Sequence, residues 1–325
     1  MRMTIEATYK CNLRCQMCFQ QVERKNNIGK KEMTTAEIKK IIDQVPSFTM
    51  ISLTGGEIFT RPDAIDLITY ASHHHRCNIV TNAALITPKI ARALVKSHLL
   101  LVGVSFDGIN LLHDKIRGVP HTFSRALKGI KLIQAEKKKQ KTKYPLIDIK
   151  TVILPENVNH LTQIFQKVVK KTGANFFTIS TLKGSNIQLA PPIKESITAQ
   201  EYSHYDRLSN NYDINLLEKQ IRYITQNKQN TVIRFYPGNL ACHLKSFYHN
   251  KITPKNYSPC YFPWTSFNIS PYGDVFPCIA LNVGNIREKN LINIWNGKKM
   301  REFRIKLKKQ KVFPACHGCC NLWLR

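Results

Sequence analysis

Hydrophobic positions along the first 180 residues follow two alternating patterns, short β-prone apolar runs and amphipathic stretches with helical spacing. The apolar runs predict six strands, at residues 3–8, 48–54, 77–81, 99–106, 146–153 and 175–180. Runs that are apolar throughout, without clean alternation, are typical of strands in a parallel sheet that helices cover. We therefore predict an α/β fold whose sheet is either open and doubly wound or a partial barrel.

Capping residues mark where the intervening helices begin. Thr34 and Glu37 have the spacing of a capping box, and Thr60 and Asp63 repeat it. Together with the other amphipathic stretches they predict helices at residues 34–45, 60–72, 87–97, 122–138, 157–171 and, in large part, 202–227.

Four segments with distinctive chemistry directly follow four of the predicted strands. They are the C-x3-C-x2-C run of Cys11, Cys15 and Cys18, then TGGE (54–57), TNA (81–83) and SFDG (105–108). Because the carboxyl ends of parallel strands meet at one edge of a sheet, we expect all four to converge. Three thiolates on one loop can hold three irons of a cubane cluster and leave the fourth iron open. For the cysteines alone, a zinc loop or buried thiols is the alternative.

The composition indicates a folded chain in a reducing compartment. Of the 325 residues 43% are hydrophobic, and no apolar run resembles a secretory signal or is long enough to span a bilayer. We therefore predict a cytoplasmic location without a membrane span. Cytosolic thiol buffers disfavour disulfides, so ten cysteines there indicate metal binding or redox chemistry.

The charge is strongly basic. Lys and Arg number 49 against 21 Asp and Glu, a formal net charge of +28, which attracts anions such as nucleic acid, phosphorylated metabolites or acidic peptides. The charges are dispersed along the chain, so an ordinary solvated basic surface explains them equally well. No recognisable nucleic-acid-binding motif accompanies them, which makes nucleic acid a less favoured partner.

The ordered set CNLRCQMC, LTGGE, IVTNAALI, VSFDG and HDKIRG resembles the radical S-adenosylmethionine (radical SAM) superfamily over about residues 3–180. The resemblance implies a partial six-stranded β/α barrel in which Cys11, Cys15 and Cys18 ligate a 4Fe–4S cluster, whose open iron chelates SAM. It also implies reductive cleavage of SAM to a 5'-deoxyadenosyl radical, which removes a hydrogen atom from the substrate.

The same resemblance implies a set of SAM-binding positions. Gly55, Gly56 and Glu57 match the segment that positions the methionine end of SAM, and Phe19 matches a position beside the adenine. Arg117 could pair with the SAM carboxylate or equally form an ion pair within its loop. The remaining positions match by their place at strand ends, and they are Asn82, Ser105 and Asp107.

A second group of cysteines lies in the last 66 residues, at positions 260, 278, 316, 319 and 320. Four thiolates would close the coordination sphere of a second cluster, which suits electron transfer, whereas a four-cysteine zinc site is the alternative. The surrounding ISPYGDVFPC and CHGCC resemble the auxiliary-cluster domains called SPASM and twitch. Because the sequence ends shortly after the last cysteine, we expect the twitch form with one 4Fe–4S cluster. The implied ligands are Cys260, Cys278, Cys316 and Cys319, with Cys320 as the alternative to Cys319.

These features predict three parts of the chain. Residues 1–182 form the radical SAM core, residues 183–257 form a mostly helical bridging segment with substrate contacts, and residues 258–325 form the auxiliary-cluster domain. No catalytic acid or base can be chosen from the sequence, because that choice requires geometry.

The predicted activity is the oxidation of a small or anionic metabolite, with the auxiliary cluster accepting an electron from the substrate radical. No leader-binding domain is expected ahead of Cys11, which disfavours a peptide substrate. The alternative is a peptide or protein maturase that works with a separate recognition partner, and a rearrangement or bond-forming reaction also remains open. A reductant such as ferredoxin or flavodoxin is the expected protein partner. A zinc-stabilised nucleic-acid-binding module is the remote alternative.

Overall fold

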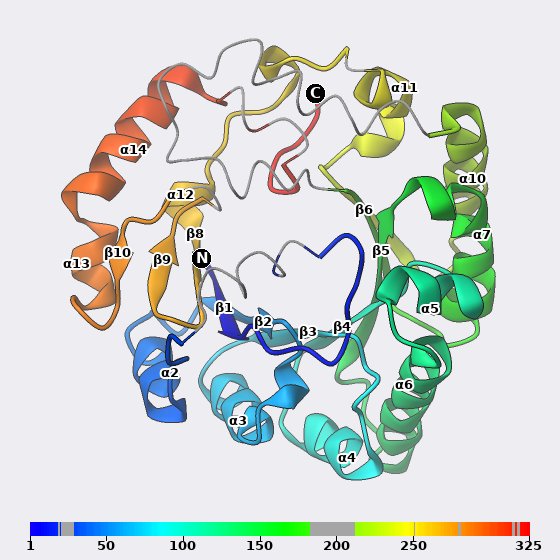
Figure 1. The fold of residues 1–325 in the computed structure, drawn as a ribbon, viewed down its shortest axis with the longest axis horizontal. Coiled ribbons are helices and arrows are strands. Elements are labelled where there is room, and N and C mark those ends of the chain that lie inside the picture. Colours follow the sequence, from blue (N-terminus) through cyan, green and yellow to red (C-terminus); the bar gives the residue numbers. More distant parts are fainter. Residues whose placement is uncertain are drawn as a thin grey trace.

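A single ten-stranded sheet forms the centre of the computed structural model. The structure describes residues 1–18, 20, 29–182, 212–249, 251–278, 281–313, 316 and 319–325. The strand order is β10-β9-β8-β1-β2-β3-β4-β5-β6-β7, so consecutive strands are neighbours throughout β1 to β7. Figure 1 shows the sheet as an arc with helices along its outer side.

The six strands predicted from the apolar runs all form, within about two residues of their expected bounds, and pair in parallel. They are β1 (Arg2–Thr8), β2 (Met50–Gly55), β3 (Cys77–Thr81), β4 (Leu101–Ser105), β5 (Leu146–Ile153) and β6 (Phe176–Thr181). Because helices cover only the outer side of the curved sheet, the core is a partial barrel and not a doubly wound sheet (Figure 1).

Helices follow the strands of the core. They are α2 (Thr35–Ile42), α3 (Ala64–His74), α4 (Pro88–Lys96), α5 (Leu111–Arg117), α6 (Thr122–Lys139), α7 (Leu161–Ile164) and α10 (Ile214–Gln226). The capping box of Thr34 and Glu37 is confirmed, since each side chain accepts a hydrogen bond from the other residue's backbone N–H. The stretch predicted as one helix at 157–171 is instead a 3-10 turn, a short α-helix and a π-helical segment.

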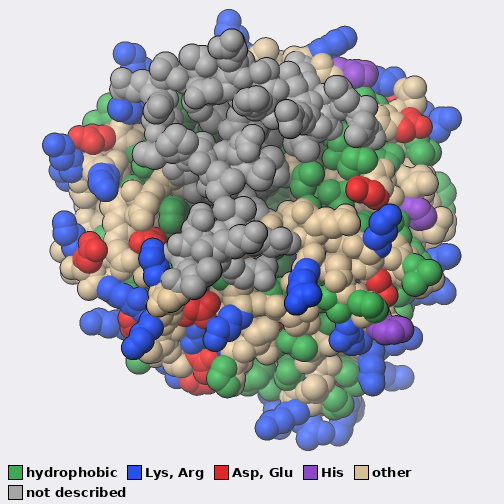
Figure 2. Space-filling view, in the orientation of Figure 1, with side chains coloured by type: hydrophobic (Ala, Val, Ile, Leu, Met, Phe, Trp, Pro, Cys, Tyr) green, Lys and Arg blue, Asp and Glu red, His purple; other side chains and the backbone are tan. Residues whose placement is uncertain are grey.

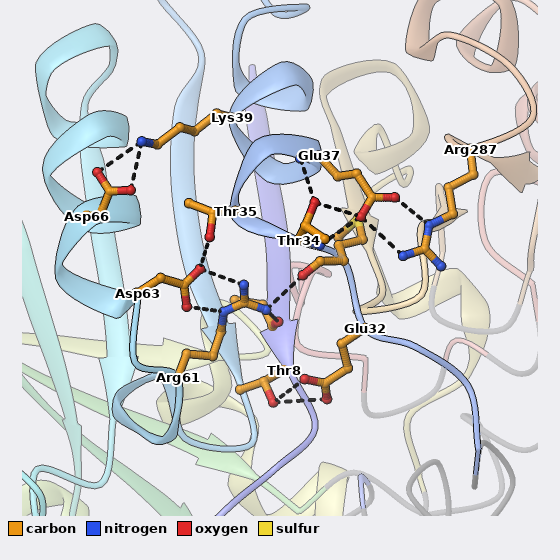
Figure 3. A network of polar contacts seen from close by, with 12 residues as sticks. Thr8, Glu32, Thr34, Thr35, Glu37, Lys39, Arg61, Asp63, Asp66 and Arg287 are labelled. Atoms are coloured by element: carbon orange, nitrogen blue, oxygen red, sulfur yellow. Dashed lines mark hydrogen bonds and ion pairs between the residues drawn. The ribbon is translucent and has the colours of Figure 1, made fainter.

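The second predicted capping box is wrong. Thr60 ends a short 3-10 helix, Ile58–Thr60, and its hydroxyl donates to the carbonyl oxygen of Glu57. Asp63 precedes α3 without capping it, because its carboxylate accepts two hydrogen bonds from the Arg61 guanidinium and one from the Thr35 hydroxyl (Figure 3). A bidentate arginine is a stronger partner for a carboxylate than a backbone N–H.

The burial pattern separates the two faces of the strands. On β5 and β6, Ile149 and Phe177 are Cα partners and fully buried, and the Phe177 ring stacks on Phe165 of the covering helical segment. Their neighbours along the strands therefore face the inside of the barrel. These inner positions are largely polar, as in Lys150 and Thr178, so the interior is not an apolar core.

Both edges of the barrel sheet are extended by strands that the sequence did not indicate. At one edge β7 (Val232–Tyr236) pairs in parallel with β6. At the other, β8 (Ser266–Ile269) pairs in parallel with β1, and β9 (Asp274–Phe276) and β10 (Gly284–Asn285) follow in antiparallel order. The C-terminal region thus continues the barrel sheet.

The C-terminal region carries short helices and a tail that returns to the barrel. The helices are α11 (Leu244–Tyr248), α12 (Phe262–Thr265), α13 (Leu291–Trp295) and α14 (Lys298–Gln310). In the tail, Leu322 O accepts from Gly238 N at 2.8 Å, just beyond β7. Asn321 Oδ1 accepts from Arg2 Nη2 at 3.2 Å, on β1. The tail therefore contacts both the first and the last strand of the barrel sheet.

The surface and the helices bear on two of the composition-based expectations. On the face drawn in Figure 2, Lys and Arg side chains lie scattered around the periphery and do not form one continuous patch. None of the helices in the described ranges is both long enough and apolar enough to cross a membrane.

An ion pair joins the barrel to the C-terminal region. Arg287, which follows β10, places its Nε 2.6 Å from Oε1 of Glu37 on α2 (Figure 3). Hydrogen bonds from Arg287 and from Thr34 lower the pKa of Glu37 to about 2, against an ordinary value of 4.5.

We expect this joint to weaken in acid. Because the pKa of Glu37 is depressed in the folded state, its stabilising contribution is complete above pH 4.5 and is lost as the pH falls towards 2. The two side chains are 37% and 31% exposed, so the effect is below about 1 kcal/mol. The urea midpoint of Glu37→Gln should lie below that of the parent at pH 6 and converge with it by pH 3. Asp66→Asn, which removes an equal charge from α3, serves as the control, and a constant difference across the pH range would contradict this reading.

Candidate active site

The loop of Cys11, Cys15 and Cys18 leaves the carboxyl end of β1 and is tied to the end of α5. Arg14 N and Gln16 N donate to the carbonyl oxygens of Arg117 and Ile116, each at 3.1 Å. Within the loop, Cys18 N donates to Cys15 O. Backbone hydrogen bonds therefore fix the loop between β1 and the segment that follows β4.

The paired glycines after β2 let two backbone segments meet. A Cβ added at Gly55 would lie 2.2 Å from Thr8 O, and one at Gly56 would lie 2.2 Å from Lys10 O. Gly55 also has a φ of +140°, which side chains rarely adopt. The close approach seen here is thus to the chain that leads into the cysteine loop, while contact with SAM remains a prediction.

Glu57 connects the ends of β2 and β3. Its carboxylate is fully buried and accepts hydrogen bonds from Thr81 Oγ1 and Asn82 N, both at 2.7 Å. Burial raises the pKa of Glu57, although these hydrogen bonds oppose the shift. Asn82 in turn donates from Nδ2 to Asn12 Oδ1 at 2.8 Å, inside the cysteine loop. Glu57 and Asn82 therefore hold the loop in position, whether or not they also contact SAM.

Asp107 and Arg117 form a buried ion pair beneath the loop. Asp107 lies two residues beyond β4 with no exposed surface, and Arg117, at the end of α5, is 9% exposed. The other carboxylate oxygen of Asp107 accepts from Val152 N at 2.7 Å. Arg117 Nη1 lies 3.6 Å from Cys15 Sγ. Of the two roles expected for Arg117, the structure shows the ion pair, and its reach to Cys15 places its charge beside the cysteine loop.

The other predicted SAM positions have different outcomes. Ser105 ends β4 and is partly exposed on the inner face of the barrel. Phe19 lies outside the described residues.

The C-terminal cysteines gather against an apolar cluster of Phe303, Leu307 and Phe313, with which Cys260, Cys278 and Cys316 are in contact. Burial raises the pKa of Cys316 well above its ordinary value, and the neighbouring thiols of Cys278, Cys319 and Cys260 raise it further. The four thiols predicted as ligands therefore lie near one another. Soft sulfur donors in an apolar setting fit an iron–sulfur cluster. Within the described ranges, no three His, Cys, Asp or Glu side chains meet closely enough to hold a single metal ion.

Comparison with known families identifies the core. The model of the radical SAM superfamily matches residues 5–168, about half of the chain. The chain belongs to the radical SAM superfamily. A second family model, SPASM, described as an iron–sulfur cluster-binding domain, matches residues 260–320, which include all five C-terminal cysteines. This radical SAM protein is thus an enzyme with 4Fe–4S clusters and SAM as cofactors. The matching model is SPASM and not the twitch form, and the number of clusters remains a prediction.

Three similar proteins place this radical SAM enzyme among characterised relatives. It is 29% identical over 311 residues to AdoMet-dependent heme synthase of Methanosarcina barkeri, covering 92% of this chain and 83% of that protein. It is 31% identical over 179 residues to mycofactocin maturase MftC of Mycobacterium tuberculosis, covering 53% of this chain and 42% of that one. Streptococcus suis SuiB bound to S-adenosylmethionine shares the fold, with a TM-score of 0.67 and 18% identity over 93% of this chain and 67% of that chain.

One residue at the base of the cysteine loop was not indicated by the sequence. Glu32 accepts hydrogen bonds from Thr8 Oγ1 at 2.8 and 2.9 Å and from Tyr9 N at 2.8 Å, so it anchors the chain just ahead of Cys11 (Figure 3). A single glutamate in a basic, irregular stretch carries no local pattern that would have revealed this contact.

Proposed function

We propose that this enzyme carries out a net oxidation of a carboxylate-bearing tetrapyrrole of the heme-precursor class. The observation that carries the proposal is the similarity to AdoMet-dependent heme synthase, which extends over 92% of this chain and includes both the barrel and the C-terminal region. An anionic substrate also agrees with the net charge of +28.

In this proposal Cys11, Cys15 and Cys18 hold the SAM-binding cluster, and Cys260, Cys278, Cys316 and Cys319 hold a single auxiliary cluster, with Cys320 as the alternative to Cys319. When bound, the reduced SAM-binding cluster supplies the electron that cleaves SAM and so generates the hydrogen-abstracting 5'-deoxyadenosyl group. The substrate loses a hydrogen atom to that group and one electron to the auxiliary site, and loss of a proton or of carbon dioxide balances the charge.

The side chains of this protein position the reactants and exclude water. Glu57 and Asn82 hold the cysteine loop against β2 and β3, and the Asp107–Arg117 pair supports it from below. The SAM-binding positions remain Phe19, Gly55, Gly56, Glu57, Asn82, Ser105, Asp107 and Arg117. We further propose a cytoplasmic enzyme that receives electrons from a carrier such as ferredoxin or flavodoxin.

Peptide maturation is the second candidate function. It is favoured by the 31% identity to mycofactocin maturase, although that similarity covers 53% of this chain. A peptide substrate would require a separate or additional recognition element.

Anaerobic reconstitution tests the proposal. We expect about eight irons and eight sulfides per chain, SAM cleavage by dithionite-reduced enzyme, and faster release of 5'-deoxyadenosine with iron-coproporphyrin III. Cys278→Ala should keep about four irons and still cleave SAM. Stimulation by a candidate precursor peptide and none by the porphyrin would favour the maturase. Zinc in place of iron, with SAM untouched, would overturn both functions.

A further inference from the structure

Two basic side chains and one acidic side chain meet on the inner face of the barrel. Lys150 and Asp148 lie on β5, and Arg234 lies on β7. Lys150 Nζ is 2.8 Å and Arg234 Nη1 is 3.9 Å from the same carboxylate oxygen, Asp148 Oδ2. Thr178 of β6, between them, donates from Oγ1 to Asp148 Oδ1 at 2.7 Å.

The strand register requires these side chains to share one face. Lys150 is the Cα partner of Thr178, and Thr178 is the Cα partner of Arg234. Paired residues on adjacent strands point to the same side of a sheet. The opposite side carries Ile149 and Phe177, which are buried under the helices. The charged group therefore lies inside the barrel.

The group carries an excess positive charge. The Asp148 side chain is 1% exposed and neutralises only one of the two cations, while the side chains of Lys150 and Arg234 are 30% and 35% exposed. Among the described residues, Asp148 is the only acidic partner of either cation. Partly exposed cations inside a barrel remain accessible to an anionic ligand.

Neighbouring residues hold both cations in place. The Arg234 guanidinium lies over the Phe176 ring, with Cζ 3.5 Å from the ring centroid, which orients its planar set of donors. On β4, a Cβ added at Gly103 would lie 2.5 Å from Lys150 Cε, so this glycine provides the space in which the lysine side chain lies across β4. These contacts indicate a built site and not two mobile surface cations.

The site adjoins the predicted SAM position at the end of β4. Lys150 is the Cα partner of Ser105, which the family resemblance assigns to SAM binding. An anion held by Lys150 and Arg234 would therefore lie on the strands next to this part of the SAM site.

We propose, on the basis of the function proposed above, that Lys150 and Arg234 bind a carboxylate of the substrate inside the barrel. Guanidinium groups bind carboxylates through paired hydrogen bonds, and an ammonium adds a point charge. Asp148, Thr178, Phe176 and Gly103 position the two cations. The carboxylate of SAM has the same chemistry, so the test must separate it from that of the substrate.

The test compares ligand binding by the reconstituted enzyme and its Lys150→Met and Arg234→Met variants. Iron-coproporphyrin III is titrated by its Soret absorbance, and SAM binding is measured by equilibrium dialysis. We expect each variant to weaken porphyrin binding about 10- to 100-fold, as for loss of a hydrogen bond to a charged group, and to leave SAM binding unchanged. Lys131→Met, which removes an exposed charge on the outer side of α6, should bind both ligands like the parent.

Gly103→Ala gives a variant with no change of charge. Because its methyl group would displace the Lys150 side chain, it should also weaken porphyrin binding. Unaltered porphyrin binding by both methionine variants would overturn the inference while leaving the tetrapyrrole function intact. Weaker SAM binding with unaltered porphyrin binding would assign the site to SAM and also overturn it.

Citrate, a simple tricarboxylate, separates failure of the inference from failure of the proposed substrate. If the parent binds citrate but not the porphyrin, and the variants lose citrate, the carboxylate site stands and the tetrapyrrole proposal fails. If the parent binds neither ligand, the inference is overturned.

Discussion

Changing Cys11, Cys15 and Cys18 together to alanine is expected to reduce the formation of 5'-deoxyadenosine from SAM to the level of a protein-free control. These three thiols lie on one loop and supply every cysteine near the carboxyl end of β1. The C-terminal cysteines come from other segments and contact Phe303, Leu307 and Phe313, so they should keep their iron. Iron should fall from about eight to about four per chain, measured after anaerobic reconstitution.

The matched control is Cys242→Ala, because Cys242 is exposed and belongs to neither group of cysteines. It should retain full iron content and full SAM cleavage. Production of 5'-deoxyadenosine by the triple variant at the parent rate would show that the first cluster is held elsewhere.

Arg117→Met is expected to destabilise the protein by about 3–5 kcal/mol, because it leaves the carboxylate of Asp107 buried without a counter-charge. Asp107 has no exposed surface, and burial already raises its pKa although Arg117 opposes the shift. The cysteine loop should also loosen, since Arg117 O accepts from Arg14 N and the guanidinium reaches Cys15. Urea unfolding monitored by circular dichroism measures the loss.

The double variant Asp107→Asn, Arg117→Met provides the control, because it removes both charges together. It should recover more than half of the lost stability, since a neutral amide costs less to bury than an unpaired carboxylate. A loss below about 1 kcal/mol in the single variant would mean that Val152 N and the other surroundings of Asp107 are sufficient without the arginine.

The sequence allowed the core strands to be predicted because each is a continuous apolar run bounded by turn or cap residues. The edge strands β7 and β8 could not be predicted in this way. Each has only four or five residues, and β8 is paired with β1, a partner more than 250 residues away. Such pairings depend on tertiary contacts that no local pattern records.

The site could be predicted to the level of its segments but not of its contacts. Parallel topology alone places the cysteine loop, TGGE, TNA and SFDG at one edge. The particular roles of Gly56 and Glu57 were not accessible, because they depend on which backbone lies opposite, here Lys10 and Asn82. Arg117 shows the same limit, since its motif was compatible with two partners and only the fold places Asp107 beside it.

The pairing of β1 with β8 has a consequence for how the chain is made. β1 is synthesised first, yet its outer neighbour β8 and its contact through Arg2 to Asn321, 319 residues later, are synthesised near the end. During translation β1 is therefore an unprotected sheet edge, open to pairing with other nascent chains. Slow or interrupted synthesis of the last sixty residues should thus promote aggregation of this protein more than it would in a barrel whose first strand is covered early.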